Sequence, residues 1–216
     1  DRILHGADVY CEDGFIKAIG RGIDSKADIT VDGSHMLCYP GLVNTHHHLY
    51  QQFSRNLPEV QGFELFDWLR YLYDIWKNID EELITLSSLT GMGELMKNGC
   101  TTCFDHHYVF PRDGGDLIAA QFEAAGLIGM RMHASRGSMD LSKKDGGLPP
   151  DSVVQTIDEI MKDSVRLIEK YHDPSKGSMR QIALAPCSPF SVSGELLRES
   201  AALARQYGVR LHTHLC

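Results

Sequence analysis

The chain has 216 residues, a formal net charge of -8 and no cluster of Lys or Arg, so binding to a nucleic-acid backbone is disfavoured. Hydrophobic residues make up 43% and charged residues 23% of the chain, as in a globular protein with a substantial core. No stretch is long and apolar enough to cross a membrane, so we expect no membrane partner. Six scattered cysteines suit a reducing compartment, and we expect a cytoplasmic protein.

Cys100 and Cys103 form a C-x-x-C pattern. No second cysteine pair lies nearby, and residues three apart on a strand face opposite sides of a sheet. We therefore interpret both thiols as core packing rather than as a metal or redox site.

Residues 1–39 have the pattern of a small β unit. Strand-like runs at 7–10, 15–19 and 29–31 are separated by turn residues such as Gly14 and Gly33. This segment is too short to form a core alone, so we expect it to be part of a small β-sandwich-like domain. The chain starts inside a strand-like run, so the sequence leaves open whether residues precede it.

From residue 40 onward, apolar strands alternate with helices. We predict five strands, at about 41–46, at 101–105, within 127–135, at 181–186 and at 209–214. Helices are predicted at 63–76, from an N-cap at Asp80 to Lys97, at 116–125 with a stop at Gly126, from a cap at Asp151 to about Tyr171, and from a cap at Ser193 to about Tyr207.

This alternation predicts a parallel α/β fold. No G-x-G-x-x-G follows the first strand, so a dinucleotide-binding sheet lacks its main support. Polar residues gather where the strands end, as they do in the site of a (β/α)8 TIM barrel, which needs about 250 residues. We therefore expect residues 40–216 to form the first five strands of such a barrel, which continues beyond this chain. The polar strand ends are His46/His48, Asp105/His106, His133/Arg136, Cys187/Ser188 and His212/His214.

Histidines at the first and fifth strand ends have the spacing of metal ligands. Residues two apart on an extended strand share a face, so His46 and His48 should point one way and His47 the other. His212 and His214 repeat that spacing. Three imidazoles with room for water are typical of a catalytic zinc site, although iron fits them as well. Such a site lowers the pKa of bound water and hydrolyses polarised C–N or C–O centres.

The segments around these histidines resemble the amidohydrolase superfamily. Residues 40–48 resemble its P-G-x-[VI]-[ND]-x-H-x-H opening, and residues 212–215 resemble its fifth-strand H-x-H-x-x-E motif. The resemblance to the aminohydrolase branch implies a (β/α)8 barrel with one divalent metal, zinc as the first choice and iron as the alternative, bound by His46, His48 and His214. It also implies a proton-shuttle glutamate just after Cys216. A sixth-strand histidine and a base aspartate would follow later, so both catalytic carboxylates are expected beyond residue 216.

Further segments resemble the 8-oxoguanine deaminase subgroup, often labelled hydroxyatrazine or chlorohydrolase-like. The resemblance implies deamination of 8-oxoguanine to urate and ammonia by metal-activated hydroxide. Guanine and a hydroxylated s-triazine are the alternative substrates. A non-catalytic metal-binding module and purely structural histidines are alternatives of another kind. The segments are 44–51, 65–69, 105–108, 135–139, 145–154 and 185–192.

The same resemblance suggests which residues contact the small heterocyclic substrate. Gln51 holds the place of a base-reading glutamine in related guanine deaminases, and an amide can both donate to and accept from a ring. Cys187 stands near the place of their arginine, which argues against plain guanine, and a buried core thiol is its alternative role. Trp68 is a candidate for the roof of the pocket, with core packing as its alternative. Relatives are commonly dimers or larger, so a homo-oligomer is expected by analogy alone.

Five other polar residues are weaker candidates for the site. Asp105 is either a carboxylate near the metal or a solvated or capping residue. Arg136 either reads a substrate carbonyl or is solvated. His106, His107 and His133 are candidates for the outer hydrogen-bond partners that metal-ligating histidines need.

Overall fold

The computed structural model describes residues 3–215 and divides the chain into two compact units, Asp1–Pro40 and Gly41–Cys216. In the first unit, β1 (Asp8–Glu12) and β2 (Phe15–Gly20) form an antiparallel hairpin. The strand predicted at 29–31 is wrong, because none of its residues pairs with another strand. None of residues 3–40 is buried. The assignment of this unit to a β-sandwich-like domain stays a prediction.

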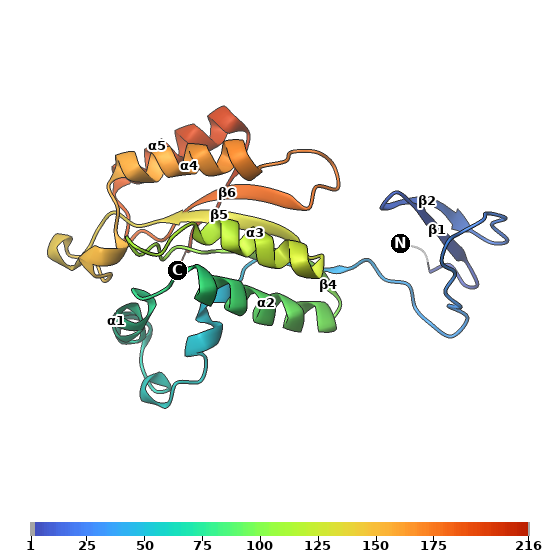
Figure 1. Ribbon diagram of the computed structural model, residues 1–216, viewed down its shortest axis with the longest axis horizontal. Helices are drawn as coiled ribbons and strands as arrows, with labels where there is room; N and C mark the ends of the chain where they lie inside the picture. Colours follow the sequence, from blue (N-terminus) through green and yellow to red (C-terminus); the bar gives the residue numbers. More distant parts are fainter. Residues whose placement is uncertain (1–2, 216) are drawn as a thin grey trace. The chain divides into compact units, whose positions relative to one another are not determined.

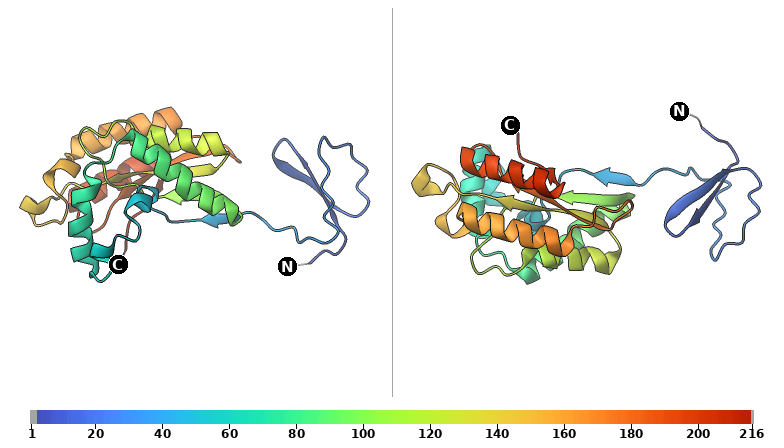
Figure 2. Two further views of the ribbon diagram at one scale, coloured as in Figure 1. Left: turned by 60° about the horizontal axis from the view of Figure 1, so that its bottom comes forward. Right: turned by 90° about the horizontal axis from the view of Figure 1, so that it is seen from above.

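The second unit is built on a parallel sheet in the order β3-β4-β5-β6-β7 (Figure 1). The sheet is curled and helices follow its outer face, so it forms part of a barrel and confirms the predicted α/β fold. Two further views show α4 and α5 packed side by side over the sheet (Figure 2). The strands are β3 (Leu42–Asn44), β4 (Cys100–Asp105), β5 (Arg131–Ser138), β6 (Arg180–Pro186) and β7 (Arg210–Leu211).

Five α-helices and four short 3-10 helices connect these strands. The predicted caps of two helices are confirmed, since the side chains of Asp80 and Ser193 accept backbone N–H groups at the starts of α2 and α5. No helix among residues 3–215 has the length and apolar character needed to span a bilayer. The helices are α1 (Leu65–Trp76), α2 (Glu81–Lys97), α3 (Leu117–Ile128), α4 (Ile157–Tyr171), α5 (Gly194–Tyr207), η1 (Leu49–Ser54), η2 (Pro58–Val60), η3 (Lys143–Asp145) and η4 (Asp151–Val153).

Two predicted helix boundaries are wrong. Helix α3 continues through Gly126 and ends at Gly129, which takes the left-handed conformation with φ 74° that a C-cap glycine provides. Helix α4 begins after Thr156 rather than at Asp151. Thr156 and Glu159 form a capping box that satisfies two backbone N–H groups, whereas Asp151 starts the separate turn η4.

The C-x-x-C pair lies in the hydrophobic core. Cys100 and Cys103 are buried, with 6% and 0% of their surfaces exposed, and both thiols are free. Cys100 and Cys103 are contributed by β4, whose neighbours are β3 and β5. The packing interpretation of these two residues is therefore confirmed.

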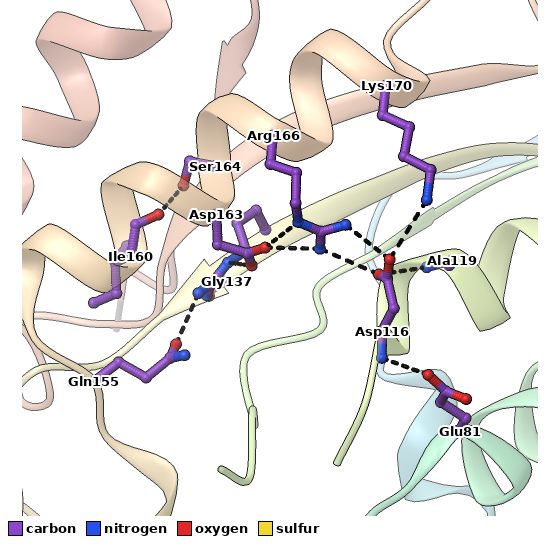
Figure 3. Close-up of polar contacts among 11 residues, drawn as sticks. Glu81, Asp116, Ala119, Gly137, Gln155, Ile160, Asp163, Ser164, Arg166 and Lys170 are labelled. Carbon is purple, nitrogen blue, oxygen red and sulfur yellow. Dashed lines mark hydrogen bonds and ion pairs between the residues drawn. The ribbon is translucent and has the colours of Figure 1, made fainter. Parts of the chain in front are cut away.

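A chain of ion pairs connects β5 to three helices (Figure 3). The Nε atom of Arg136 donates to Asp163 of α4 at 2.6 Å, and Arg166 of the same helix pairs with Asp163 and Asp116, each at 2.7 Å. Asp116 caps α3, and its backbone N–H donates to Glu81 of α2 at 2.6 Å. Successive strand–helix units are thereby joined on the outside of the sheet.

The solvated role considered for Arg136 is wrong, because its side chain is fully buried. Its remaining guanidinium nitrogens donate to the Gln155 side chain at 2.7 Å and to the backbone oxygen of Gly137. The cation also lies 4.1 Å from the centre of the Phe110 ring. These contacts engage the guanidinium within the fold, so a substrate carbonyl would have to compete with them.

This arrangement predicts that removing Asp163 destabilises the protein more than removing Arg136. Asp163→Asn leaves a buried guanidinium without its counter-charge and should lower the free energy of unfolding by about 2–4 kcal/mol. Arg136→Met should cost less, since Asp163 is 26% exposed and keeps Arg166. Urea denaturation of the whole protein measures both. Equal losses, or a larger loss in Arg136→Met, would contradict this assignment.

Candidate metal centre and adjoining cavity

Four histidines leave the sheet at the carboxyl ends of its two outermost strands. Strand β3 ends at Asn44 and β7 ends at Leu211, so His46, His48, His212 and His214 follow the strands rather than lying within them. The predicted strands at 41–46 and 209–214 are therefore too long. Strand alternation cannot set the directions of these side chains, and their hydrogen bonds must do so.

Three of these imidazoles converge through their Nε2 atoms. The Nε2 atom of His48 lies 3.1 Å from that of His46 and 3.1 Å from that of His214. All three residues have ligand atoms within 4.8 Å of one another. The structure thus brings together the three histidines that the sequence singled out as metal ligands.

Hydrogen bonds at the Nδ1 atoms determine whether the Nε2 atoms carry a hydrogen or a lone pair. The Nδ1 atom of His48 lies 2.7 Å from the backbone oxygen of His106, and the Nδ1 atom of His214 lies 2.9 Å from that of Cys187. A carbonyl oxygen only accepts, so both Nδ1 atoms carry a hydrogen and both Nε2 atoms present lone pairs. Two acceptors facing each other at 3.1 Å need a cation between them. The donor set therefore fits a divalent metal such as zinc.

Burial keeps these imidazoles in the neutral form that binds metals. Desolvation lowers the pKa of His48 to about 3, and the carbonyl of His106 opposes this shift only in part. Desolvation also lowers the pKa values of His46, His212 and His214. At neutral pH, protons therefore compete weakly with a metal for this site.

Asp105 is buried next to the candidate metal centre and does not face solvent. Its side chain is fully buried, and its two oxygens accept from the backbone N–H of Leu49 at 2.7 Å and from the Gln121 amide at 2.6 Å. The solvated role considered for Asp105 is therefore wrong, whereas the capping role is compatible with its contact to Leu49, the first residue of η1. Because Leu49 directly follows His48, this carboxylate fixes the chain where it leaves the metal centre. Burial raises the pKa of Asp105 to about 7.

The other candidate outer histidines differ from one another. The backbone oxygen of His106 holds His48, while the His106 ring stacks on His214 at 4.3 Å and its two nitrogens have no hydrogen-bond partner among residues 3–215. His107 is also fully buried without a side-chain partner. His133 is half-buried on β5. The backbone contact of His106 was missed, since side-chain patterns carry no information on backbone carbonyls.

A cavity of about 590 Å³ lies beside His46, His48 and His214. Gln51, Cys187 and Trp68 all line it, so the structure brings the three proposed substrate contacts to one place. None of the described residues that line the cavity is Lys, Arg, Asp or Glu. The lining combines aromatic and aliphatic side chains with several hydroxyl groups, and its aromatic and hydroxyl members include Phe66, Tyr73, Tyr108, Phe190, Ser188 and Ser191.

Cys187 contributes to both the cavity and the metal centre. Its thiol is 4% exposed, and burial raises its pKa to about 12, so it stays protonated and is a poor nucleophile at neutral pH. Its backbone oxygen orients His214. Both interpretations of this residue, a core thiol and a cavity-lining residue, are compatible with these contacts.

The chain matches a family model and several characterised proteins. The model described as "Amidohydrolase family" matches residues 37–216. An 8-oxoguanine deaminase from Pseudomonas aeruginosa is 48% identical over 184 residues, which cover 85% of this chain and 41% of that protein. A hydroxydechloroatrazine ethylaminohydrolase from a Pseudomonas species is 40% identical over 226 residues, covering 99% of this chain and 47% of that protein. The chain thus spans less than half the length of these relatives.

Solved structures share the fold. Atrazine chlorohydrolase TrzN from Arthrobacter aurescens, complexed with zinc, superposes with a TM-score of 0.85 at 30% identity, over 97% of this chain and 48% of that one. A guanine deaminase from C. acetobutylicum with bound guanine gives a TM-score of 0.75 over 97% of this chain and 48% of that one. Its identity is 19%, so it shows likeness of fold alone.

The contacts of Asp105 predict different outcomes for two substitutions. Asp105→Leu leaves the Leu49 N–H and the Gln121 amide buried without partners and should cost about 1–3 kcal/mol for each group. Asp105→Asn keeps an acceptor for Leu49, and its NH2 group can donate to the Gln121 Oε1 atom, which has no partner, once that amide rotates. Thermal unfolding and metal affinity should therefore be near parental only for Asp105→Asn. Equal damage by both variants would contradict this role.

The buried histidines predict acid sensitivity of the metal-free protein. Burial lowers the pKa of His48 and of His107 to about 3, so the unfolded chain binds more protons than the folded one below about pH 6.5. Stability should therefore fall as the pH decreases from about 6.5 towards 3. Asp105, with its raised pKa, acts in the opposite direction between about pH 4 and 7, but the lowered histidines outnumber it.

Thermal unfolding of chelator-treated protein at about pH 7 and about pH 5.5 tests this balance. The Tm should be lower at the more acidic pH, and His107→Leu should reduce the difference. A Tm that is unchanged or higher at the acidic pH would contradict it.

Proposed function

The chain belongs to the amidohydrolase family, and from this premise we propose that its protein is a metal-dependent aminohydrolase acting on a small heterocycle. The convergence of three Nε2 lone pairs from His46, His48 and His214 carries the proposal. A divalent metal held there would supply a Lewis acid that activates water for hydrolysis. Zinc is the favoured ion, since a related structure is complexed with zinc.

The residues of this chain contribute orientation and an environment for the reaction. The backbone oxygens of His106 and Cys187 hold two imidazoles in the tautomer that presents Nε2. The aromatic wall, including Trp68, gives a planar ring an apolar face to pack on. Gln51 can donate to one ring atom and accept from another. The proton-shuttle glutamate and the base aspartate remain expected beyond residue 216.

Within this reaction we propose 8-oxoguanine as the substrate, with water entering and ammonia leaving to give urate. The cavity lining without Lys, Arg, Asp or Glu supports a neutral heterocycle, and Gln51, the proposed contact to its ring, is a neutral amide. The similarity to a named 8-oxoguanine deaminase supports the choice. A hydroxylated s-triazine is the second candidate, because a relative at 40% identity carries such a name.

The substrate proposal predicts a ranking of amine release by the whole, metal-loaded protein, measured as ammonia from the purines and as ammonia or ethylamine from the triazine. 8-Oxoguanine should have the highest kcat/KM, above guanine and a hydroxylated s-triazine. Guanine as fast as 8-oxoguanine would overturn the substrate assignment, and a faster triazine would favour the second candidate. Chelation should abolish release and zinc should restore it. A protein that binds zinc yet acts on none of these compounds would support a non-catalytic metal-binding module.

Side chains of the cavity provide a sharper test. Gln51→Leu removes a donor and an acceptor and should lower kcat/KM by about 10–100-fold without releasing the metal. Gln51→Glu is the matched control of similar shape that keeps an acceptor and loses the amide donor. Loss of metal in Gln51→Leu would show that Gln51 acts on the centre rather than on the substrate.

A further inference from the structure

We propose that His212 is a positioning residue that holds the imidazole of His46 in the tautomer and orientation needed for metal binding. This inference rests on the proposed metal-dependent function and assigns a role to the histidine that the three-ligand set leaves unused. His212 lies two residues before His214, and its ring contacts His46 across the sheet from β7 to β3.

The three proposed ligands are oriented in two different ways. His48 and His214 donate from Nδ1 to the backbone oxygens of His106 and Cys187. The Nδ1 atom of His46 instead lies 2.9 Å from Nε2 of His212. Among the three, His46 is therefore the one whose orientation depends on a side chain, and a single substitution can remove that partner.

Hydrogen-bond chemistry fixes the tautomers along this contact. His46 must present a lone pair at Nε2 to bind a metal, so its hydrogen lies on Nδ1 and is donated to His212. The Nε2 atom of His212 accepts it, which leaves the hydrogen of His212 on Nδ1. The pair therefore acts as a side-chain equivalent of the carbonyl contacts made by the other two ligands.

His212 is itself held firmly before any metal arrives. Its backbone N–H donates to Leu184 of β6 at 2.9 Å, and its ring packs against Phe104 of β4, with the ring centres 4.6 Å apart. The contact with His46 joins the loops after the two outermost strands of the sheet, which are 166 residues apart in sequence. An acceptor supported in this way limits rotation of the His46 ring.

A second metal bound by His46, His106 and His212 is the competing interpretation, since these residues also have ligand atoms within 4.8 Å of one another. The 2.9 Å separation of His46 and His212 is that of an N–H···X hydrogen bond. Using that nitrogen for a second metal would require both ring nitrogens of His46 to be ligands. The hydrogen bond needs no such change, and we therefore prefer it.

Substitutions that differ in reach test the role of His212. The amide oxygen of Gln can take the place of Nε2 and accept from His46, whereas the shorter Asn and the apolar Leu cannot. In the whole protein, zinc affinity should fall by about 10–100-fold for His212→Leu and His212→Asn and should be largely restored in His212→Gln. The visible spectrum of the cobalt-loaded protein should change in the first two variants and stay parental in Gln. His172→Leu removes a half-buried histidine that accepts from the backbone N–H of Ile182 and belongs to neither histidine cluster, so it is the matched control.

Each outcome separates the possibilities. Parental zinc affinity and cobalt spectrum in His212→Asn would overturn the positioning role, and the contrast between Asn and Gln decides the matter even where Leu fails to fold. Two zinc ions per parental chain, one of them lost in His212→Leu and in His106→Leu, would establish the second metal site instead. A parental protein without bound metal would overturn the proposed function itself, which is a different result from a metal-binding protein that is indifferent to residue 212.

Discussion

The 3.1 Å approach of the Nε2 atoms of His48 and His214 is the contact on which the interpretation of the site depends. Each nitrogen is forced to be an acceptor because the opposite nitrogen of its ring donates to a backbone carbonyl. Two such lone pairs do not stabilise each other, so the arrangement fits a cation between them. The fold has to hold this unfavourable contact in place, and much of the surrounding structure can be understood from that requirement.

Backbone groups at strand ends provide most of the support. His106 follows β4 and Cys187 follows β6, and both carbonyls point towards rings carried by the loops after β3 and β7. The backbone N–H of His106 donates to the oxygen of His47 at 2.7 Å, which ties the loop after β4 to the loop after β3. Asp105 adds the Leu49 contact beneath them. The curled parallel sheet therefore contributes to the site mainly by fixing the positions of backbone carbonyl and amide groups at the carboxyl ends of its strands.

The sequence predicted what depends on local pattern. The alternation of apolar strands with helices, and the caps at Asp80 and Ser193, could be predicted because they follow from periodicity and nearby hydrogen bonds. The helix starting at Asp151 failed because two acceptable N-caps lie five residues apart, and the capping box of Thr156 prevails.

The buried contacts around the site could not be predicted from the sequence, for a different reason. Burial of Asp105 and Arg136 depends on partners distant in the chain, such as Leu49 and Asp163. Strand alternation was also the wrong reason for pairing His46 with His48, since both lie after β3. Their partnership comes from ring hydrogen bonds to His212 and to the backbone of His106, and no spacing rule reports these.

The contacts at position 187 suggest how metal binding and substrate choice can be separated in this fold. His214 is oriented mainly by the carbonyl of residue 187, a group that every amino acid carries, with the thiol at the longer distance of 3.8 Å from the same Nδ1 atom, and residue 187 also lines the cavity. The side chain can therefore change without removing the acceptor that the metal ligand needs. The side chain of Gln51 can also change independently of the metal ligands. It lies in η1, whose first backbone N–H, that of Leu49, is held by Asp105. The proposed substrate contacts thus depend on side chains, and two of the three proposed ligands depend on main chain. His46 is the exception, because its partner is the side chain of His212, and at that point the sequence of the chain controls the metal centre directly.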